Sequence, residues 1–99
     1  MTQNRDDIFK AIRQNHDSIR KYGVRRLGVF GSFARNQADS SSDIDILVDL
    51  EKKTFDAYMG LKFFLEDLFG RSVDLVLTDS IKPRIRETIL RETVYVEGL

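Results

Sequence analysis

A glycine turn followed by two nearby carboxylates is the part of this chain most suited to chemistry. Gly31-Ser32 closes a short apolar run, and Asp43-Ile44-Asp45 follows after ten intervening residues. A glycine at the end of a strand leaves the backbone bare, so that peptide N–H groups can approach a phosphate. Two carboxylates roughly 6 to 7 Å apart along a strand repel each other unless a cation lies between them, and such oxygen ligands suit Mg²⁺. The pattern therefore predicts metal-assisted phosphate chemistry.

The residues around these acids predict a strand that displays them. Asp43 and Asp45 alternate with Ile44, Ile46 and Val48. Because side chains along a strand point to alternate sides, the acids share one face and the apolar residues take the other. We expect the apolar face to anchor the strand in the core.

A third acid, Asp74, lies within another apolar run of strand length, Ser72–Leu77. We expect Val73, Leu75 and Leu77 to face the core and Asp74 to point the opposite way. If this strand lies beside the first, three carboxylates converge. Such a triad can hold one or two Mg²⁺ ions that bridge nucleotide phosphates, and Asp74 can also take the proton of an attacking hydroxyl.

These motifs resemble those of the polymerase-beta-like nucleotidyltransferase superfamily. More closely, the segments 31–35 and 42–48, with the end 82–96, resemble the minimal nucleotidyltransferases called MntA-type antitoxins, and the resemblance spans nearly the whole chain. In that family the Gly-Ser turn holds the nucleotide triphosphate and three acids bind Mg²⁺. The resemblance carries these catalytic, metal-binding and nucleotide-binding roles to Gly31, Ser32, Asp43, Asp45 and Asp74.

The resemblance also implies a partner and a reaction. Such proteins pair with a HEPN-domain ribonuclease toxin in a hetero-oligomer, and silence it by binding it and by transferring AMP from ATP to one of its tyrosines. One departure is Asn36, where many relatives carry glycine; asparagine also tolerates left-handed backbone angles. Two alternatives remain open: an antitoxin that blocks the toxin by binding alone, and a nucleotidyltransferase that modifies a small molecule or an RNA end.

Other polar side chains carry more than one interpretation. Arg35 lies four residues after Gly31, where its guanidinium could reach triphosphate oxygens or make a surface salt bridge. The last helix carries basic residues that suit either an acidic partner or solvent: Arg84, Arg86 and Arg91. His16, the only histidine, is assigned no role.

Composition narrows the class of protein. The 99 residues suit one nucleotidyltransferase domain, 1–99, without the second helical domain that many such enzymes use to hold an acceptor. The charges of sixteen basic and sixteen acidic side chains cancel. A net charge of zero disfavours a nucleic-acid partner, because such binding depends on neutralising phosphates. The absence of cysteine fits a reducing cytosol, and neither a leader-like apolar stretch nor a run of membrane length occurs. These observations predict a soluble cytoplasmic protein with no membrane contact.

The apolar periodicity predicts an α+β fold, with a small mixed sheet packed by about three helices. The helices are expected at 4–21, 54–69 and 81–92, and a short final strand is expected after the last of them. The first helix should bury Ile8, Ile12, Ile19 and Tyr22, and the last should bury Ile85 and Ile89. The middle helix, capped by Thr54 and stopped by Gly70, has more apolar surface than one stripe needs, so Phe63 or a neighbour either widens the core face or forms a partner-binding patch.

Overall fold

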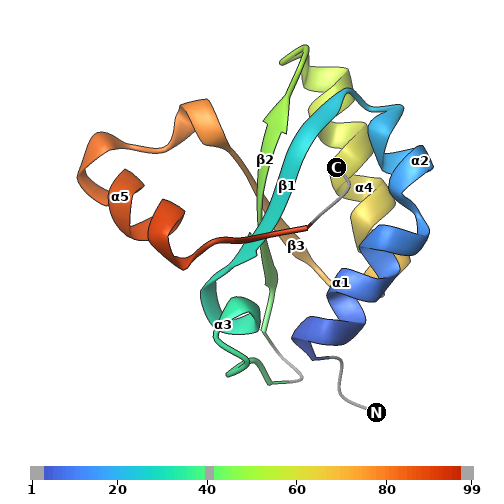
Figure 1. Cartoon of the computed structure of the whole chain (residues 1–99). Helices are drawn as coiled ribbons and strands as arrows, with labels where there is room; N and C mark the ends of the chain where they lie inside the picture. The colour runs from blue at the N-terminus through green and yellow to red at the C-terminus, as the bar shows by residue number, and fades with distance from the viewer. Residues whose placement is uncertain (1–3, 40–41, 97–99) are drawn as a thin grey trace.

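A four-stranded mixed sheet with the order β3-β2-β1-β4 forms the centre of the fold (Figure 1). In the computed structural model, which describes residues 4–39 and 42–96, β1 runs antiparallel to β2 and β4, whereas β2 and β3 are parallel. The strands are β1 (Val24–Phe30), β2 (Ile44–Leu50), β3 (Val73–Leu77) and β4 (Val94–Tyr95). The expected final strand is therefore present as β4.

Five α-helices surround the sheet in the described part of the chain, which confirms the α+β class but exceeds the expected three. They are α1 (Arg5–Gln14), α2 (His16–Arg20), α3 (Gly31–Ala34), α4 (Phe55–Phe69) and α5 (Pro83–Glu92), with a 3-10 turn η1 (Thr78–Ser80). The additional helices arise because the first predicted helix is divided and because the Gly-Ser turn itself forms the short helix α3.

The first predicted helix is divided at Asn15, which adopts φ −116° and ψ 20°. Its side-chain amide donates to the Ala11 carbonyl oxygen at 2.8 Å, so that asparagine competes with the backbone for the last turn of α1. At the other end of α1, Asn4 and Asp7 form a reciprocal capping box. The local polar side chains thus set both ends of α1.

Helices α1, α2 and α4 cover one face of the sheet (Figure 1). Ile8, Ile12 and Ile19 from α1 and α2 are fully buried there, as predicted, and Tyr22 is partly buried against them. Each such buried isoleucine contributes about 1.5 to 3 kcal/mol to folding. This layer anchors the sheet on which the acidic residues lie.

Helix α4 begins and ends where the sequence predicts. The Thr54 hydroxyl accepts from the Ala57 N–H at 3.1 Å, and Gly70 ends the helix with φ 68°. Leu61 and Leu65 face the core, whereas Phe63 remains 56% exposed. The apolar surplus on α4 is therefore partly displayed at the surface.

The prediction for the last helix is wrong in two respects. Helix α5 begins at Pro83 rather than two residues earlier, because the residue before a proline is held in an extended conformation. Ile85 is 48% exposed and no residue of α5 is buried, so the expected burial of Ile85 and Ile89 does not occur. The helix lies on the side of the sheet opposite α1, α2 and α4 and stands away from it (Figure 1).

Candidate active site

The parallel pairing of β2 and β3 brings two of the three acids together. Asp45 and Asp74 are register partners in this ladder. The alternating residues Ile44 and Ile46 are fully buried in the core, so Asp45 faces the side of the sheet away from α1, α2 and α4. Asp43 is exposed one residue before β2 and shares this alternation with Asp45. The structure thus places the acidic residues at one end of the two strands.

Gly31 lies directly against Asp45. Phe30, which immediately precedes Gly31, is the register partner of Asp45 between β1 and β2. Gly31 has φ 71°, and a Cβ atom added there would lie 3.1 Å from Asp45 Cγ and would overlap its Oδ2. Glycine is needed for both the backbone angle and the close approach. The predicted phosphate turn and the predicted metal-binding acids therefore belong to one site.

Burial and the neighbouring acids alter the ionisation of Asp45. Burial, followed by the charges of Asp74 and Asp43, raises the pKa of the Asp45 carboxyl to about 6, from an ordinary value of 3.8. A side-chain hydrogen bond with Asp74 acts in the same direction, whereas the positive charge of Arg35 lowers this pKa. A carboxyl group with a pKa displaced in this way, among other acids, is typical of functional sites.

Ser32 lies in the first turn of α3, next to Gly31. The Ser32 carbonyl oxygen accepts from the Gln37 N–H at 2.8 Å, which closes the chain back on itself after the helix. Asn36 provides the reversal with φ 59°, so the expectation that asparagine can replace glycine here is confirmed. The turn expected from the sequence is thus a compact helical loop beside Asp45.

Arg35 makes the salt bridge that the sequence offered as one of its two roles. Its Nη1 lies 3.3 Å from Glu92 Oε2 on α5, and its Nε donates to Gln37 Oε1 at 3.2 Å. Both charged side chains of the bridge are partly exposed, so the pair contributes at most about 1 kcal/mol. The effect of Arg35 on the pKa of Asp45 shows that its charge also acts on the acidic site.

The acids offer oxygen ligands to a metal ion, but they are not yet gathered around one point. Within residues 4–39 and 42–96, no group of three or more His, Cys, Asp or Glu side chains is already arranged to hold an ion. The donor atoms are nevertheless the carboxylate oxygens that Mg²⁺ prefers. A cation would also relieve the repulsion that Asp45 experiences from Asp74 and Asp43. The residues therefore fit Mg²⁺ in their chemistry, with Asp45 and Asp74 already adjacent.

Arg71 is a positioning residue that the sequence did not reveal. It lies between α4 and β3, and its Nη1 donates to the carbonyl oxygens of Ser42 at 3.0 Å and Asp39 at 3.3 Å. Its guanidinium also lies 5.1 Å from the centre of the Phe33 ring in α3. Arg71 thus holds the segment that leads directly into Asp43, and only the tertiary structure brings these parts together.

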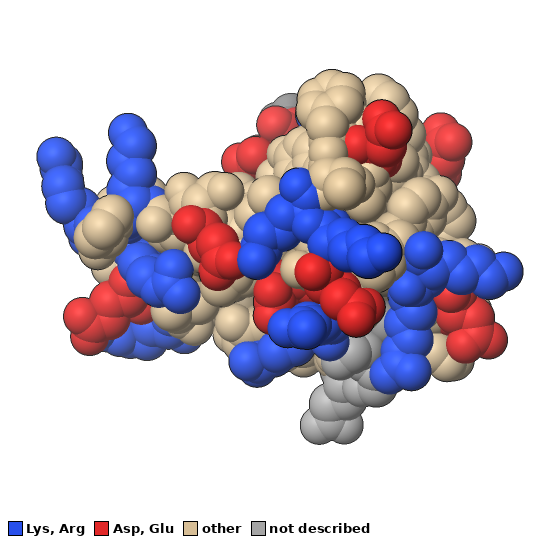
Figure 2. Space-filling model, turned by 90° about the horizontal axis from the view of Figure 1, so that it is seen from above, with Lys and Arg blue, Asp and Glu red and all other residues tan. Residues whose placement is uncertain are grey.

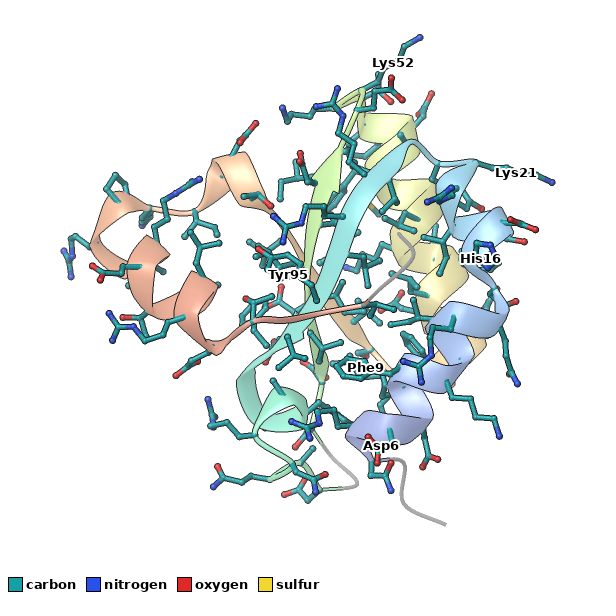
Figure 3. All side chains as sticks on the ribbon, in the orientation of Figure 1. Asp6, Phe9, His16, Lys21, Lys52 and Tyr95 are labelled. Carbon is teal, nitrogen blue, oxygen red and sulfur yellow. The ribbon has the colours of Figure 1, made fainter. Side chains whose placement is uncertain are left out.

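Tyr95 also lies near the acidic face, although no sequence pattern predicted a role for it. It is the register partner of Gly28, and Figure 3 shows it beside β1 on the side that faces α5. The guanidinium of Arg26 lies 3.9 Å from the centre of its ring. Gly28 was the available signal, because a glycine inside a strand often marks a close approach of another segment.

The remaining charged residues show mainly local contacts. Arg86 donates to the Thr78 carbonyl oxygen at 2.9 Å, and Arg91 pairs with Glu87 at 2.8 Å. Basic side chains project from the α5 end of the molecule, whereas both signs mix over the centre (Figure 2). His16 lies on α2 (Figure 3), where its Nε2 is 3.0 Å from Asp17 Oδ1. No helix in the described ranges is both long and apolar enough to cross a membrane.

Comparisons with known proteins show the family to which this chain belongs. The family model for the nucleotidyltransferase domain matches residues 7–96. The chain is 48% identical to the protein adenylyltransferase MntA of Thermococcus cleftensis over 93 residues. The matched region covers 92% of this chain and 94% of that relative. A solved structure of a minimal nucleotidyltransferase is 36% identical, with a TM-score of 0.73, over 87% of this chain and 93% of that one.

The fold is also shared with a more distant complex. The structure of a tri-AMPylated HEPN toxin with an MNT antitoxin, from Shewanella oneidensis, matches with a TM-score of 0.60 and 23% identity, over 97% of this chain and 71% of that one. The chain therefore belongs to the nucleotidyltransferase domain family and, within it, to the MntA-type protein adenylyltransferases.

Proposed function

We propose that this chain is the antitoxin of a HEPN/MNT toxin–antitoxin pair and that it transfers AMP from ATP to a tyrosine of the toxin. One observation carries the proposal: Asp45 is paired with Asp74 and packs against Gly31, so that acids and phosphate turn form one site. The named activity of the relative from Thermococcus cleftensis supports the reaction. The Shewanella oneidensis complex, in which an MNT antitoxin accompanies an AMPylated HEPN toxin, supports the partner.

Each site residue has a defined task in this proposal. The backbone of Gly31 and Ser32 holds the β- and γ-phosphates of ATP, and Arg35 adds a positive charge beside them. Asp43 and Asp45 would hold the Mg²⁺ that accompanies the triphosphate, and Asp74 would help them to hold a second ion. Bound Mg²⁺ neutralises phosphate charge and lowers the pKa of the acceptor hydroxyl.

The transfer itself exchanges one phosphorus–oxygen bond for another. Asp74 orients the tyrosine hydroxyl of the toxin and takes its proton. The hydroxyl oxygen bonds to the α-phosphorus, the bond from that phosphorus to the bridging oxygen breaks, and pyrophosphate leaves. The product is a tyrosine that carries AMP through a phosphodiester. We place this activity in one cytoplasmic domain, residues 1–99, with the acceptor supplied by the partner in a hetero-oligomer.

The proposal is tested by incubating the purified protein with labelled ATP, Mg²⁺ and the cognate HEPN protein. We expect label on the toxin, lost in Asp43→Asn and kept in Asp67→Asn, which makes the same change on the exposed side of α4. No label on the toxin, or full transfer by Asp43→Asn, would overturn the catalytic assignment. Toxin that is still neutralised by Asp43→Asn at normal expression would show that binding alone suffices, and label on RNA or a small molecule without toxin would favour the other alternative.

A further inference from the structure

A groove lies beside the outer edge of the sheet, between β3 and the first turns of α4. It has a volume of about 470 Å³. Its apolar lining comes from Phe55 and Tyr58 of α4 and from Leu75, Val76 and Leu77 of β3. Since β3 is the last strand of the sheet on this side, the groove opens at the edge of the molecule.

Phe55 at the rim of this groove is unusually exposed. Its exposed fraction is 77%, above those of Phe63, Ile85 and Val94, the other large apolar side chains displayed in the described ranges. A phenylalanine left in water forgoes the hydrophobic stabilisation that burial of its ring would give. An exposed aromatic residue beside an apolar groove is typical of a surface that a partner covers.

The hydrogen bonds along β3 indicate what the groove can accept. Tyr58 donates its hydroxyl to the Leu75 carbonyl oxygen at 2.5 Å, and Glu66 accepts from the Val73 N–H at 3.0 Å. The Leu75 carbonyl and the Val73 N–H are therefore already hydrogen-bonded to side chains of α4. Because these two groups are not available to another strand, strand addition at this edge is disfavoured. The groove instead offers an apolar surface for a side chain.

The position of the groove links it to the acidic site. Asp74 is exposed on the same strand, and Leu77 lies three residues further on, which is about 10 Å along a strand. A stable protein interface covers about 800 Å² on each partner, which corresponds to a radius of about 16 Å. Asp74 alternates with the buried Val73 and Leu75, so it points away from α4, and a protein that approaches over the open edge of β3 can both present a hydroxyl to Asp74 and cover the groove.

We propose that this groove, formed by α4 and β3 around Phe55, docks the acceptor protein by receiving one of its large apolar side chains. The inference rests on the proposed function, because it assumes an acceptor that approaches Asp74 as a folded protein. Contact at Phe55 and transfer at Asp74 are then two parts of one interface. The groove determines how firmly the acceptor is held, whereas the acids and the turn determine the chemistry.

Two variants test the groove without touching the acids. Phe55→Ser removes the exposed ring, and Ser80→Phe fills the groove from a residue that is exposed at its lining. We expect each to weaken binding of the HEPN protein at least about tenfold, measured by biolayer interferometry without ATP. The KM for the HEPN protein should rise by a similar factor, whereas affinity for Mg²⁺-ATP should be unchanged.

Phe63→Ser is the matched control, since it removes the same side chain from the same helix outside the groove. It should change binding less than twofold. Unchanged binding by Phe55→Ser, or equal losses at Phe55 and Phe63, would overturn the docking inference even when the wild type transfers AMP. If the wild type binds the HEPN protein but transfers no AMP, the catalytic proposal is overturned. The binding measurements on the Phe55 and Phe63 variants would still test the docking inference. A loss of self-association in Phe55→Ser with no loss of HEPN binding would assign the groove to a second copy instead.

Discussion

Asp45 of β2 and Asp74 of β3 are direct neighbours across the parallel ladder, although the two residues lie far apart in the sequence. This arrangement places like charges side by side and, together with burial, which is the larger cause, raises the pKa of Asp45. Such repulsion destabilises the ligand-free fold, and it is relieved when a cation binds. The pairing therefore has the character of a binding site rather than of a contact that stabilises the sheet.

The first prediction separates the paired acids from a neighbouring carboxylate. Asp45→Asn and Asp74→Asn should each lower the rate of AMP transfer about a hundredfold or more, because both remove charge from the site where phosphate charge is neutralised. Asp49→Asn is the control, since Asp49 lies four residues along the same face of β2 and its register partner is Arg26. Rates are measured with saturating ATP; an equal loss in Asp49→Asn would contradict a special role for the pair.

The second prediction concerns the stability of the metal-free protein as the pH changes. In the folded protein the pKa of Asp45 is about 6, whereas the unfolded chain releases this proton near 3.8. Below pH 4 this carboxyl therefore contributes its full stabilisation, which is lost as the pH rises through 6. The Tm of the wild type minus that of Asp45→Asn, measured in a chelator, should decrease between pH 4 and pH 7.

Added Mg²⁺ provides the control for this pH dependence. At pH 7 it should raise the Tm of the wild type and leave that of Asp45→Asn nearly unchanged, because the variant lacks a carboxylate of the proposed site. A difference in Tm that stays constant from pH 4 to pH 7 would show that Asp45 titrates normally.

Sequence could predict the parts of the site that depend on local signals. Alternating residues placed Asp45 and Asp74 opposite the buried side chains of their strands, and Thr54 and Gly70 fixed the ends of α4. The sequence predicts that the acids converge only if β2 and β3 are adjacent, and it does not say whether they are. The structure makes β2 and β3 adjacent and pairs Asp45 with Asp74, but within residues 4–39 and 42–96 it gathers no group of three acids ready to hold an ion. It also adds the contact between Gly31 and Asp45 that no spacing could reveal.

Long-range packing explains what the sequence could not predict. The sequence of α5 is amphipathic, and the helix forms. Periodicity does not say, however, whether another element covers the apolar side of a helix, and Ile85 remains exposed. The division at Asn15 depends on one side-chain hydrogen bond that competes with the helix backbone. Arg71 positions the approach to Asp43 only because the turn between α4 and β3 lies beside it.

The third prediction separates the two roles of Arg35. Arg35→Gln should raise the KM for ATP about tenfold, because it removes a positive charge beside the triphosphate. Glu92→Gln breaks the same salt bridge but keeps the arginine, so it should change the KM less than twofold. If both variants change the KM alike, Arg35 acts by holding α5 to α3 and not by binding the nucleotide.

The fourth prediction compares two glycines that share a backbone angle. Gly31 and Gly70 have φ 71° and 68°, so alanine should strain the backbone at either position by about 1 kcal/mol or more. A Cβ at Gly70 meets nothing within 4 Å, whereas one at Gly31 overlaps the Asp45 carboxylate. Gly31→Ala should therefore lose AMP transfer and more stability than Gly70→Ala, which should keep its activity. Urea denaturation and the transfer assay measure both effects, and equal behaviour of the two variants would show that the contact between Gly31 and Asp45 does not shape the site.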